Sequence, residues 1–217
     1  MDRTTLASML DHTLLKPEAT AAEVEALCIE ATDLGVAAIC VSPSHLPITT
    51  GLGPRIGIAT VIGFPSGAHQ PAVKAHETEV ALDAGATEFD MVLNLGLAKA
   101  GEWRSVGDDI SAVRAASAGG LHKELLEPAA LTDDEIVAAC LAAHAAGADY
   151  VKTSTGFHPS GGATTAAVRL MARTVDGRLG VKASGGIRDA ATALAMVEAG
   201  ATRIGCSASR VILDGVS

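Results

Sequence analysis

The chain has 217 residues, of which 48% are hydrophobic and 19% are charged, a composition that predicts a globular domain with a large core. The formal net charge of −9 argues against nucleic acids and acidic membrane surfaces as main partners. With one Trp, one Tyr and three Phe, few side chains could stack on nucleobases. No apolar run approaches the roughly 20 residues of a membrane-spanning helix, and the N-terminus shows no secretory pattern, so we expect a cytoplasmic protein without membrane contact.

Predicted strands and helices alternate along the chain. Apolar segments of strand length cover residues 10–15, 36–41, 56–62, 88–94, 121–127, the segment that carries Lys152, 179–183 and 202–205. Helix signals begin near Thr20, Pro71, Trp103, Thr132, Thr164 and Asp189. With no linker or low-complexity segment between them, these elements predict one (β/α)8 barrel domain over residues 1–217. A doubly wound open sheet is the alternative, but no GxGxxG follows the first strand.

A weak internal repeat indicates where an active site would lie. Four helix-to-strand joints contain a glycine that can end a helix, namely Gly35, Gly85, Gly147 and Gly200. Five residues beyond these glycines lie Cys40, Asp90, Lys152 and Gly205. If the joints are equivalent, these residues lie near the carboxyl ends of their strands, where such barrels keep their active sites.

Two lysines stand near the ends of apolar strands, Lys152 and Lys182. Ammonium groups are rarely buried without a partner, so Lys152 is interpreted either as an edge residue that reaches solvent or as a reactive amine. An ordinary lysine has a pKa near ~10.4, which burial and a neighbouring cation both lower. Because consecutive strands are usually neighbours, Lys182 is expected to supply that cation. This pairing favours Lys152 as a nucleophile that forms a Schiff base.

Several other charged residues are candidates for the same site. Asp90, inside an apolar strand, is interpreted as a counter-ion for a lysine, as a group that relays protons, or as both. Asp11 is a weaker candidate of the same kind. Lys123 and Glu127 occupy alternate positions of one strand and are expected to join the network, whereas Glu124 should point the other way.

Glycine-rich turns after the last strands predict a phosphate site. Glycines allow backbone N–H groups to approach an anion, and the loops after strands seven and eight are the usual phosphate site of such barrels. The residues expected to contribute are Gly156, Gly185, Gly186, Arg188, Gly205 and Ser207. The seven histidines are dispersed without HxH or HExxH, so we expect neither a metal nor a cofactor. The four cysteines form no CxxC pair and are expected to be reduced, with Cys40 lining the pocket.

Together these segments resemble one known family. The matching motifs are Asp11-His12-Thr13-Leu14-Leu15-Lys16-Pro17, Ile62-Gly63-Phe64-Pro65, Asp90-Met91-Val92-Leu93-Asn94, Val151-Lys152-Thr153-Ser154-Thr155-Gly156-Phe157 and Val181-Lys182-Ala183-Ser184-Gly185-Gly186-Ile187-Arg188. They resemble the deoxyribose-phosphate aldolase family over nearly the whole chain.

The resemblance implies a class I aldolase that interconverts 2-deoxy-D-ribose 5-phosphate with glyceraldehyde 3-phosphate and acetaldehyde, as in deoxyribonucleoside catabolism. It implies Lys152 as the Schiff-base lysine and Asp90 and Lys182 as its proton-transfer and pKa-lowering partners. The supporting positions are Asp11, Thr13, Cys40 and Lys123. We further expect a homo-oligomer, either a dimer or a tetramer.

Three positions depart from the family pattern: Ser42, Glu124 and Ala208. The missing hydroxyl at Ala208 bears on phosphate affinity more than on the reaction. Two alternatives stay open, another phosphosugar barrel of the transaldolase or synthase kind, and a phosphosugar-binding protein without catalysis.

Overall fold

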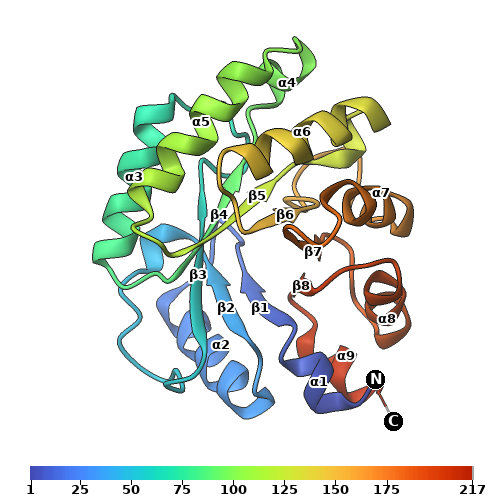
Figure 1. Cartoon of the computed structure of the whole chain (residues 1–217). Coiled ribbons are helices and arrows are strands. Elements are labelled where there is room, and N and C mark those ends of the chain that lie inside the picture. The colour runs from blue at the N-terminus through green and yellow to red at the C-terminus, as the bar shows by residue number, and fades with distance from the viewer. Residues whose placement is uncertain (217) are drawn as a thin grey trace.

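The computed structural model describes residues 1–216 and contains a closed barrel of parallel strands surrounded by helices (Figure 1). The strands are β1 (Leu10–Leu14), β2 (Ala38–Val41), β3 (Gly57–Ile62), β4 (Glu88–Val92), β5 (Leu121–Leu125), β6 (Tyr150–Lys152), β7 (Gly180–Ser184) and β8 (Arg203–Cys206). Each strand pairs with the next, and β8 pairs with β1 by placing Gly205 opposite Asp11. The predicted (β/α)8 barrel is confirmed.

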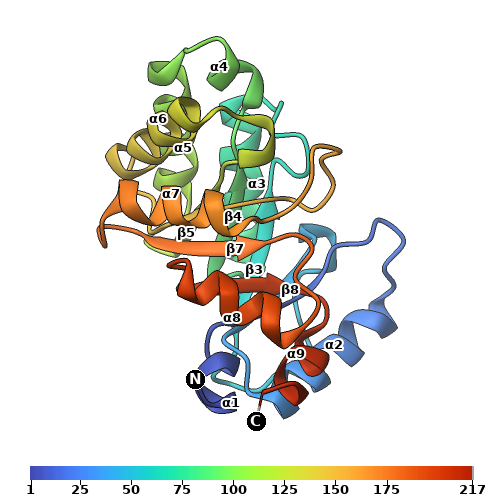
Figure 2. The same ribbon diagram turned by 90° about the vertical axis from the view of Figure 1, so that its right-hand side faces the viewer.

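Helices form the outer layer of the barrel in both views (Figures 1 and 2). They are α1 (Arg3–Ala7), α2 (Ala21–Leu34), α3 (Pro71–Asp83), α4 (Leu95–Lys99), α5 (Trp103–Ala116), α6 (Asp133–Ala145), α7 (Thr165–Val175), α8 (Ala190–Glu198) and α9 (Ser209–Asp214). Two short 3₁₀ turns, Pro43–His45 and Pro128–Ala130, follow β2 and β5. Helices α1 and α9 lie side by side at one end of the molecule.

The helix boundaries follow from local chemistry that the sequence shows. Thr20 and Thr132 each accept from the backbone N–H of a glutamate three residues later, whose carboxylate accepts in return from the threonine N–H. These reciprocal bonds satisfy N–H groups that a helix start leaves without a partner. Asp189 caps α8 as expected. Gly35 ends α2 in the left-handed region, with φ 66°.

Some predicted boundaries were wrong. The strand expected over 88–94 ends at Val92, because Asn94 instead caps the unpredicted helix α4 by accepting from the Leu97 N–H. The strand expected over 121–127 ends at Leu125, and the backbone of Glu127 lies in the left-handed region at φ 57°. Helices α1 and α4 have five residues each, too short to show a helical hydrophobic period.

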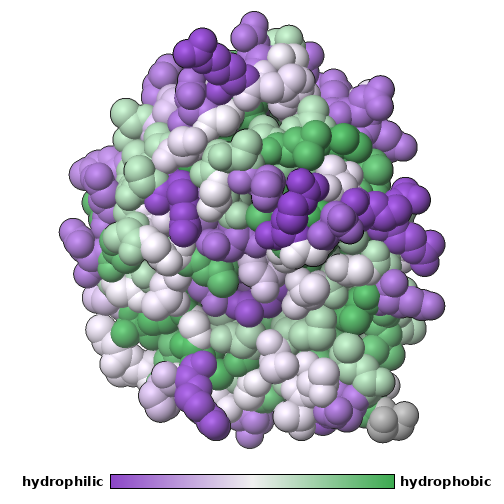
Figure 3. Space-filling view, viewed as in Figure 1, coloured by the Kyte–Doolittle hydropathy of each residue, from purple (hydrophilic) through white to green (hydrophobic). Residues whose placement is uncertain are grey.

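Strand alternation separates two kinds of buried side chain. Most apolar strand residues face outward and pack under the helices, while a smaller apolar group of Ala38, Cys40, Ala59 and Val61 forms a separate cluster. On the surface seen in Figure 3, hydrophobic side chains occur in scattered groups among hydrophilic ones. Within residues 1–216, none of the helices combines the length and apolar character that crossing a bilayer requires.

Candidate active site

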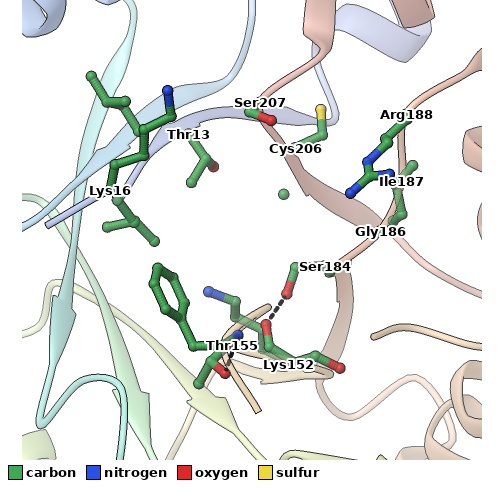
Figure 4. Close-up of a pocket in the computed structure, with 16 residues that line it drawn as sticks. Thr13, Lys16, Lys152, Thr155, Ser184, Gly186, Ile187, Arg188, Cys206 and Ser207 are labelled. Carbon is green, nitrogen blue, oxygen red and sulfur yellow. Dashed lines mark hydrogen bonds between the residues drawn. The ribbon is translucent and has the colours of Figure 1, made fainter. Parts of the chain in front are cut away.

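A cavity of about 250 Å³ opens where the strands carry their carboxyl ends. Its walls come from the segments after β1, β6, β7 and β8, the face on which barrels of this class do their chemistry. The lining residues are Thr13, Leu14, Leu15, Lys16, Lys152, Ser154, Thr155, Phe157, Ser184, Gly185, Gly186, Ile187, Arg188, Gly205, Cys206 and Ser207. In Figure 4, the amine of Lys152 points into this cavity and Arg188 lies across from it.

Within residues 1–216, Lys152 is held by a single carboxylate. Its Nζ donates to Asp90 Oδ2 at 2.8 Å, and only 3% of the residue is exposed. The next strand places Lys182 directly opposite Lys152, and Lys182 Nζ donates to the same Asp90 oxygen at 2.6 Å. The predicted neighbourhood of two lysines and one aspartate is therefore present. Of the three, only Lys152 borders the cavity.

Asp11 and Lys123 belong to the same buried network. Lys182 Nζ also donates to Asp11 Oδ2, and Lys123 Nζ donates to Asp90 Oδ1 at 2.8 Å. Thr13 lines the cavity, and its hydroxyl donates to the backbone carbonyl of Asp11 at 2.9 Å. All the predicted charged residues of this group are fully buried apart from Lys152.

Sequence reasoning missed two members of the network, Glu88 and Arg203. Glu88 Oε2 lies 2.6 Å from Lys123 Nζ, and Arg203 Nη2 donates to both Glu88 carboxylate oxygens at 2.7 Å. Both residues could have been found from strand alternation. Glu88 lies two positions before Asp90, and Arg203 lies two positions before Gly205, so each shares the inward face of its strand.

The ion pairs fix the charge states of the network. Burial would raise the pKa of Asp90, but the ammonium groups of Lys123, Lys152 and Lys182 outweigh it and hold this pKa well below its ordinary value. Burial would likewise lower the pKa of Lys182, but Asp11 and Asp90 outweigh it and raise that pKa. Lys182 is therefore a permanent cation at neutral pH, and Asp90 a permanent anion.

Most of the residues predicted to bind a phosphate line the far end of the cavity. Gly185 and Gly186 have φ of 95° and 82°, a backbone conformation that residues with a side chain rarely adopt. Both glycines line the cavity together with Arg188. A side chain at Gly205 would be crowded, because its Cβ would lie 3.1 Å from both Lys182 Cε and Ser184 Cβ. Ser207 lines the cavity next to Gly205.

Three expected positions differ in the structure. Cys40 does not line the cavity, because its side chain is fully buried in an apolar cluster with Ala38, Ala59 and Val61, and the cavity thiol is Cys206. Burial raises the pKa of both thiols to about 11. Glu127 does not join the lysines, since it accepts from the N–H and hydroxyl of Thr155 and fixes the loop after β6. Gly156 is exposed and is not among the residues that line the cavity.

Comparison with known proteins agrees with this geometry. Residues 5–215 match the family model described as DeoC/LacD family aldolase. The chain belongs to that family. It is 59% identical over 215 residues to the deoxyribose-phosphate aldolase of Kocuria rhizophila, a match that covers 99% of this chain and 98% of the relative. It is 56% identical over 219 residues to the deoxyribose-phosphate aldolase of Mycobacterium tuberculosis, with coverage of 99% and 97%.

Solved structures of aldolases in this family share the fold closely. The tetrameric deoxyribose phosphate aldolase of Aeropyrum pernix superposes with a TM-score of 0.90 at 36% identity, covering 98% of this chain and 91% of that one. A putative deoxyribose-phosphate aldolase from Coccidioides immitis gives a TM-score of 0.92 at 39% identity, with coverage of 99% and 86%. The family resemblance inferred from the lysine motifs is confirmed.

Proposed function

We propose that this chain is a deoxyribose-phosphate aldolase that cleaves 2-deoxy-D-ribose 5-phosphate, reversibly, through a Schiff base on Lys152. The observation that carries the proposal is the position of Lys152. It is the one amine of the buried network described here that also borders the cavity, and it stands across the cavity from Arg188. A phosphosugar with its aldehyde near Lys152 and its phosphate near Arg188 fits this arrangement.

The reaction begins when the neutral amine of Lys152 attacks the C1 aldehyde of the open-chain sugar. Loss of water gives a protonated imine, which accepts electrons. The C2–C3 bond then breaks as the C3 hydroxyl loses its proton, which releases glyceraldehyde 3-phosphate and leaves a two-carbon enamine on Lys152. Protonation of the enamine at C2 and hydrolysis release acetaldehyde and restore the amine.

The buried residues have distinct roles in this scheme. Lys182 supplies a fixed positive charge beside Lys152, and Asp90 holds both amines through one oxygen. Because the pKa of Lys182 is raised and that of Asp90 is lowered, Lys182 does not readily give up its proton at neutral pH and Asp90 does not readily accept one. A water molecule that contacts Asp90 or Lys182 is therefore our proposed carrier of the substrate protons.

The phosphate is proposed to bind to Arg188, to the backbone of Gly185 and Gly186, and to Ser207. Arg188 makes no ion pair within residues 1–216, so its guanidinium is free to meet an anion. The adjacent α8 begins at Ala190 and adds a favourable dipole for an anion near its start.

Trapping of the Schiff base tests the proposal. The protein is incubated with acetaldehyde, reduced with borohydride and mapped by peptide mass spectrometry. We expect one ethyl adduct on Lys152, cleavage of 2-deoxy-D-ribose 5-phosphate, and loss of both in Lys152→Met. The exposed Lys99→Met, whose ammonium pairs with Glu135, serves as the matched control. An adduct on another lysine, or cleavage that persists in Lys152→Met, would contradict the proposal, and a protein that binds the sugar phosphate without an adduct would be a binding protein.

We also propose a homo-oligomer in the cytoplasm. The tetrameric Aeropyrum pernix relative supports self-association, and four buried free cysteines suit a reducing compartment. Light scattering of the purified protein and fractionation of cells test the two statements, and a monomer or a secreted protein would contradict them.

A further inference from the structure

Six charged side chains inside the barrel alternate in sign around a closed circuit. In order they are Asp90, Lys123, Glu88, Arg203, Asp11 and Lys182, which returns to Asp90, and we call them the inner ring. Each residue contacts its two neighbours of opposite charge in the ring, and Lys123 Nζ also lies 3.8 Å from Asp11 Oδ2 across it. The ring joins five strands, β1, β4, β5, β7 and β8, and so exists only because the barrel is closed.

Glu88 and Arg203 complete this circuit between Lys123 and Asp11. Arg203 Nε donates to Asp11 Oδ1 at 2.5 Å, while its Nη2 reaches both oxygens of Glu88 at 2.7 Å. Glu88 in turn holds Lys123 at 2.6 Å. Their side chains are 11% and 13% exposed, and neither residue lines the cavity. They therefore act on the reaction only through the ring.

The charge count singles out Lys152. The inner ring holds three acids and three bases and is neutral as a unit. Lys152 lies outside it and contacts one carboxylate, Asp90, which Lys123 and Lys182 already share. A protonated Lys152 thus adds an unmatched positive charge to a buried site, and unmatched buried charge is costly. With Lys152 as a neutral amine, the site is balanced.

We propose that Glu88 and Arg203 are positioning residues that close the inner ring, hold Lys123 and Lys182 as cations, and leave Lys152 as the amine that gives up its proton. This inference rests on the proposed Schiff-base function. Neither residue contacts the substrate site, so their effect is electrostatic and has a sign that can be measured.

Other groups near Lys152 do not replace the ring. The charged and titratable groups that face it are the six ring residues, the Cys40 thiol, and three groups of the cavity wall, Lys16, Arg188 and the Cys206 thiol, whose pKa burial raises to about 11. Burial raises the pKa of Cys40 to about 11, so this thiol stays neutral. Lys123 and Asp11 keep their charges, because the carboxylates outweigh burial and raise the pKa of Lys123, and the cations outweigh burial and lower the pKa of Asp11.

The test measures the rate of imine formation against pH, by borohydride trapping with acetaldehyde, in wild type, Glu88→Gln, Arg203→Gln and the double variant. Glu88→Gln leaves the ring positive and should move the acid limb of the profile to lower pH. Arg203→Gln leaves it negative and should move the limb to higher pH. Each shift should be about one pH unit, as expected for a unit charge several ångströms away, and the double variant should return near wild type. Arg203→Lys keeps the positive charge, so the acid limb of its pH profile should stay in place even if its rate of imine formation changes.

Shifts of the same sign in both single variants, or none in folded variants, would overturn the proposal. If the variants do not fold, ¹³Cε-lysine NMR of the wild-type protein decides the question, because Lys123 and Lys182 should remain charged up to about pH 10. A titration of Lys182 near neutral pH would overturn it. Failure of the proposed function looks different, since the wild-type protein would then trap no adduct at any pH.

Discussion

The two faces of β5 carry two buried polar groups that differ in how their charges are paired and in the direction in which their carboxyl pKa values shift. Lys123 faces inward and belongs to the inner ring. On either side of it, His122 and Glu124 face outward and approach Lys74 of α3 and Asp109 of α5. We call these four residues the outer cluster, and Figure 1 shows the two helices that contribute to it, α3 and α5, side by side on the outside of the barrel. All four are buried, with at most 1% exposed.

The difference lies in how completely each group is paired. In the outer cluster, Lys74 Nζ donates to Asp109 Oδ2 at 2.6 Å and to the Val92 carbonyl at 2.9 Å. Both Glu124 oxygens and both His122 ring nitrogens, however, lack a hydrogen-bond partner among the described residues, although Nε2 and Oε2 lie 3.4 Å apart. Burial raises the pKa of Glu124 and of Asp109, whereas the cations lower those of Asp11 and Asp90. The closed circuit lowers the pKa of its carboxylates, whereas incomplete pairing leaves burial to raise the pKa of the carboxyls in the outer cluster.

Of the variants that test this difference, Asp90→Asn in the inner ring should have the largest effect. The amide removes the negative charge that Lys123, Lys152 and Lys182 share, so three buried ammonium groups lose their common partner. We expect cleavage to fall at least about 10²-fold and the free energy of unfolding to fall by about 3–5 kcal/mol. Initial rates and urea unfolding measure the two effects. Full activity in this variant would remove Asp90 from the site.

Breaking the outer ion pair should affect stability alone. Asp109→Asn leaves the buried ammonium of Lys74 without its counter-charge and should reduce the free energy of unfolding by about 3 kcal/mol. Because the outer cluster lies on the other side of the barrel wall, kcat/KM of the folded enzyme should not change. The exposed neighbour Asp108→Asn is the matched control, with an expected effect within about 0.5 kcal/mol. Lost activity in folded Asp109→Asn would show that the two groups are coupled.

Removing the carboxyl that lacks partners should stabilise the protein. Glu124→Leu replaces two buried oxygens without hydrogen bonds by apolar surface of similar size, so urea unfolding should show a gain of about 1–2 kcal/mol. A loss of stability instead would mean that Glu124 has a partner in solution.

The pH dependence of these variants should have opposite signs. The pKa of Glu124 is raised in the folded state, so its contribution to stability is fully present below about 4.5 and is lost as pH rises through the folded pKa. The gain from Glu124→Leu should therefore be larger at pH 8 than at pH 4. The pKa of Asp90 is lowered, so its contribution is present above about 3.8 and is lost as pH falls further. The cost of Asp90→Asn should shrink in that acid range, and urea unfolding across pH tests both trends.

Local signals in the sequence determined the order of the elements and much of the site. Capping boxes at Thr20 and Thr132, and glycine joints such as Gly35, mark where helices start and end, because they depend on residues within one turn. The adjacency of Lys152 and Lys182 also followed, since consecutive strands of a barrel pair with each other.

Only the tertiary structure decided how the charges connect. Glu88 and Arg203 are 115 positions apart in sequence, and they meet because barrel closure brings the inward faces of β4 and β8 together. Tertiary structure also decided that Cys40 is buried and that Glu127 accepts a hydrogen bond from the Thr155 hydroxyl instead of pairing with the lysines. Sequence periodicity assigns a side chain to a face of its own strand, but which charges become partners across that face depends on distances between strands that no local pattern contains.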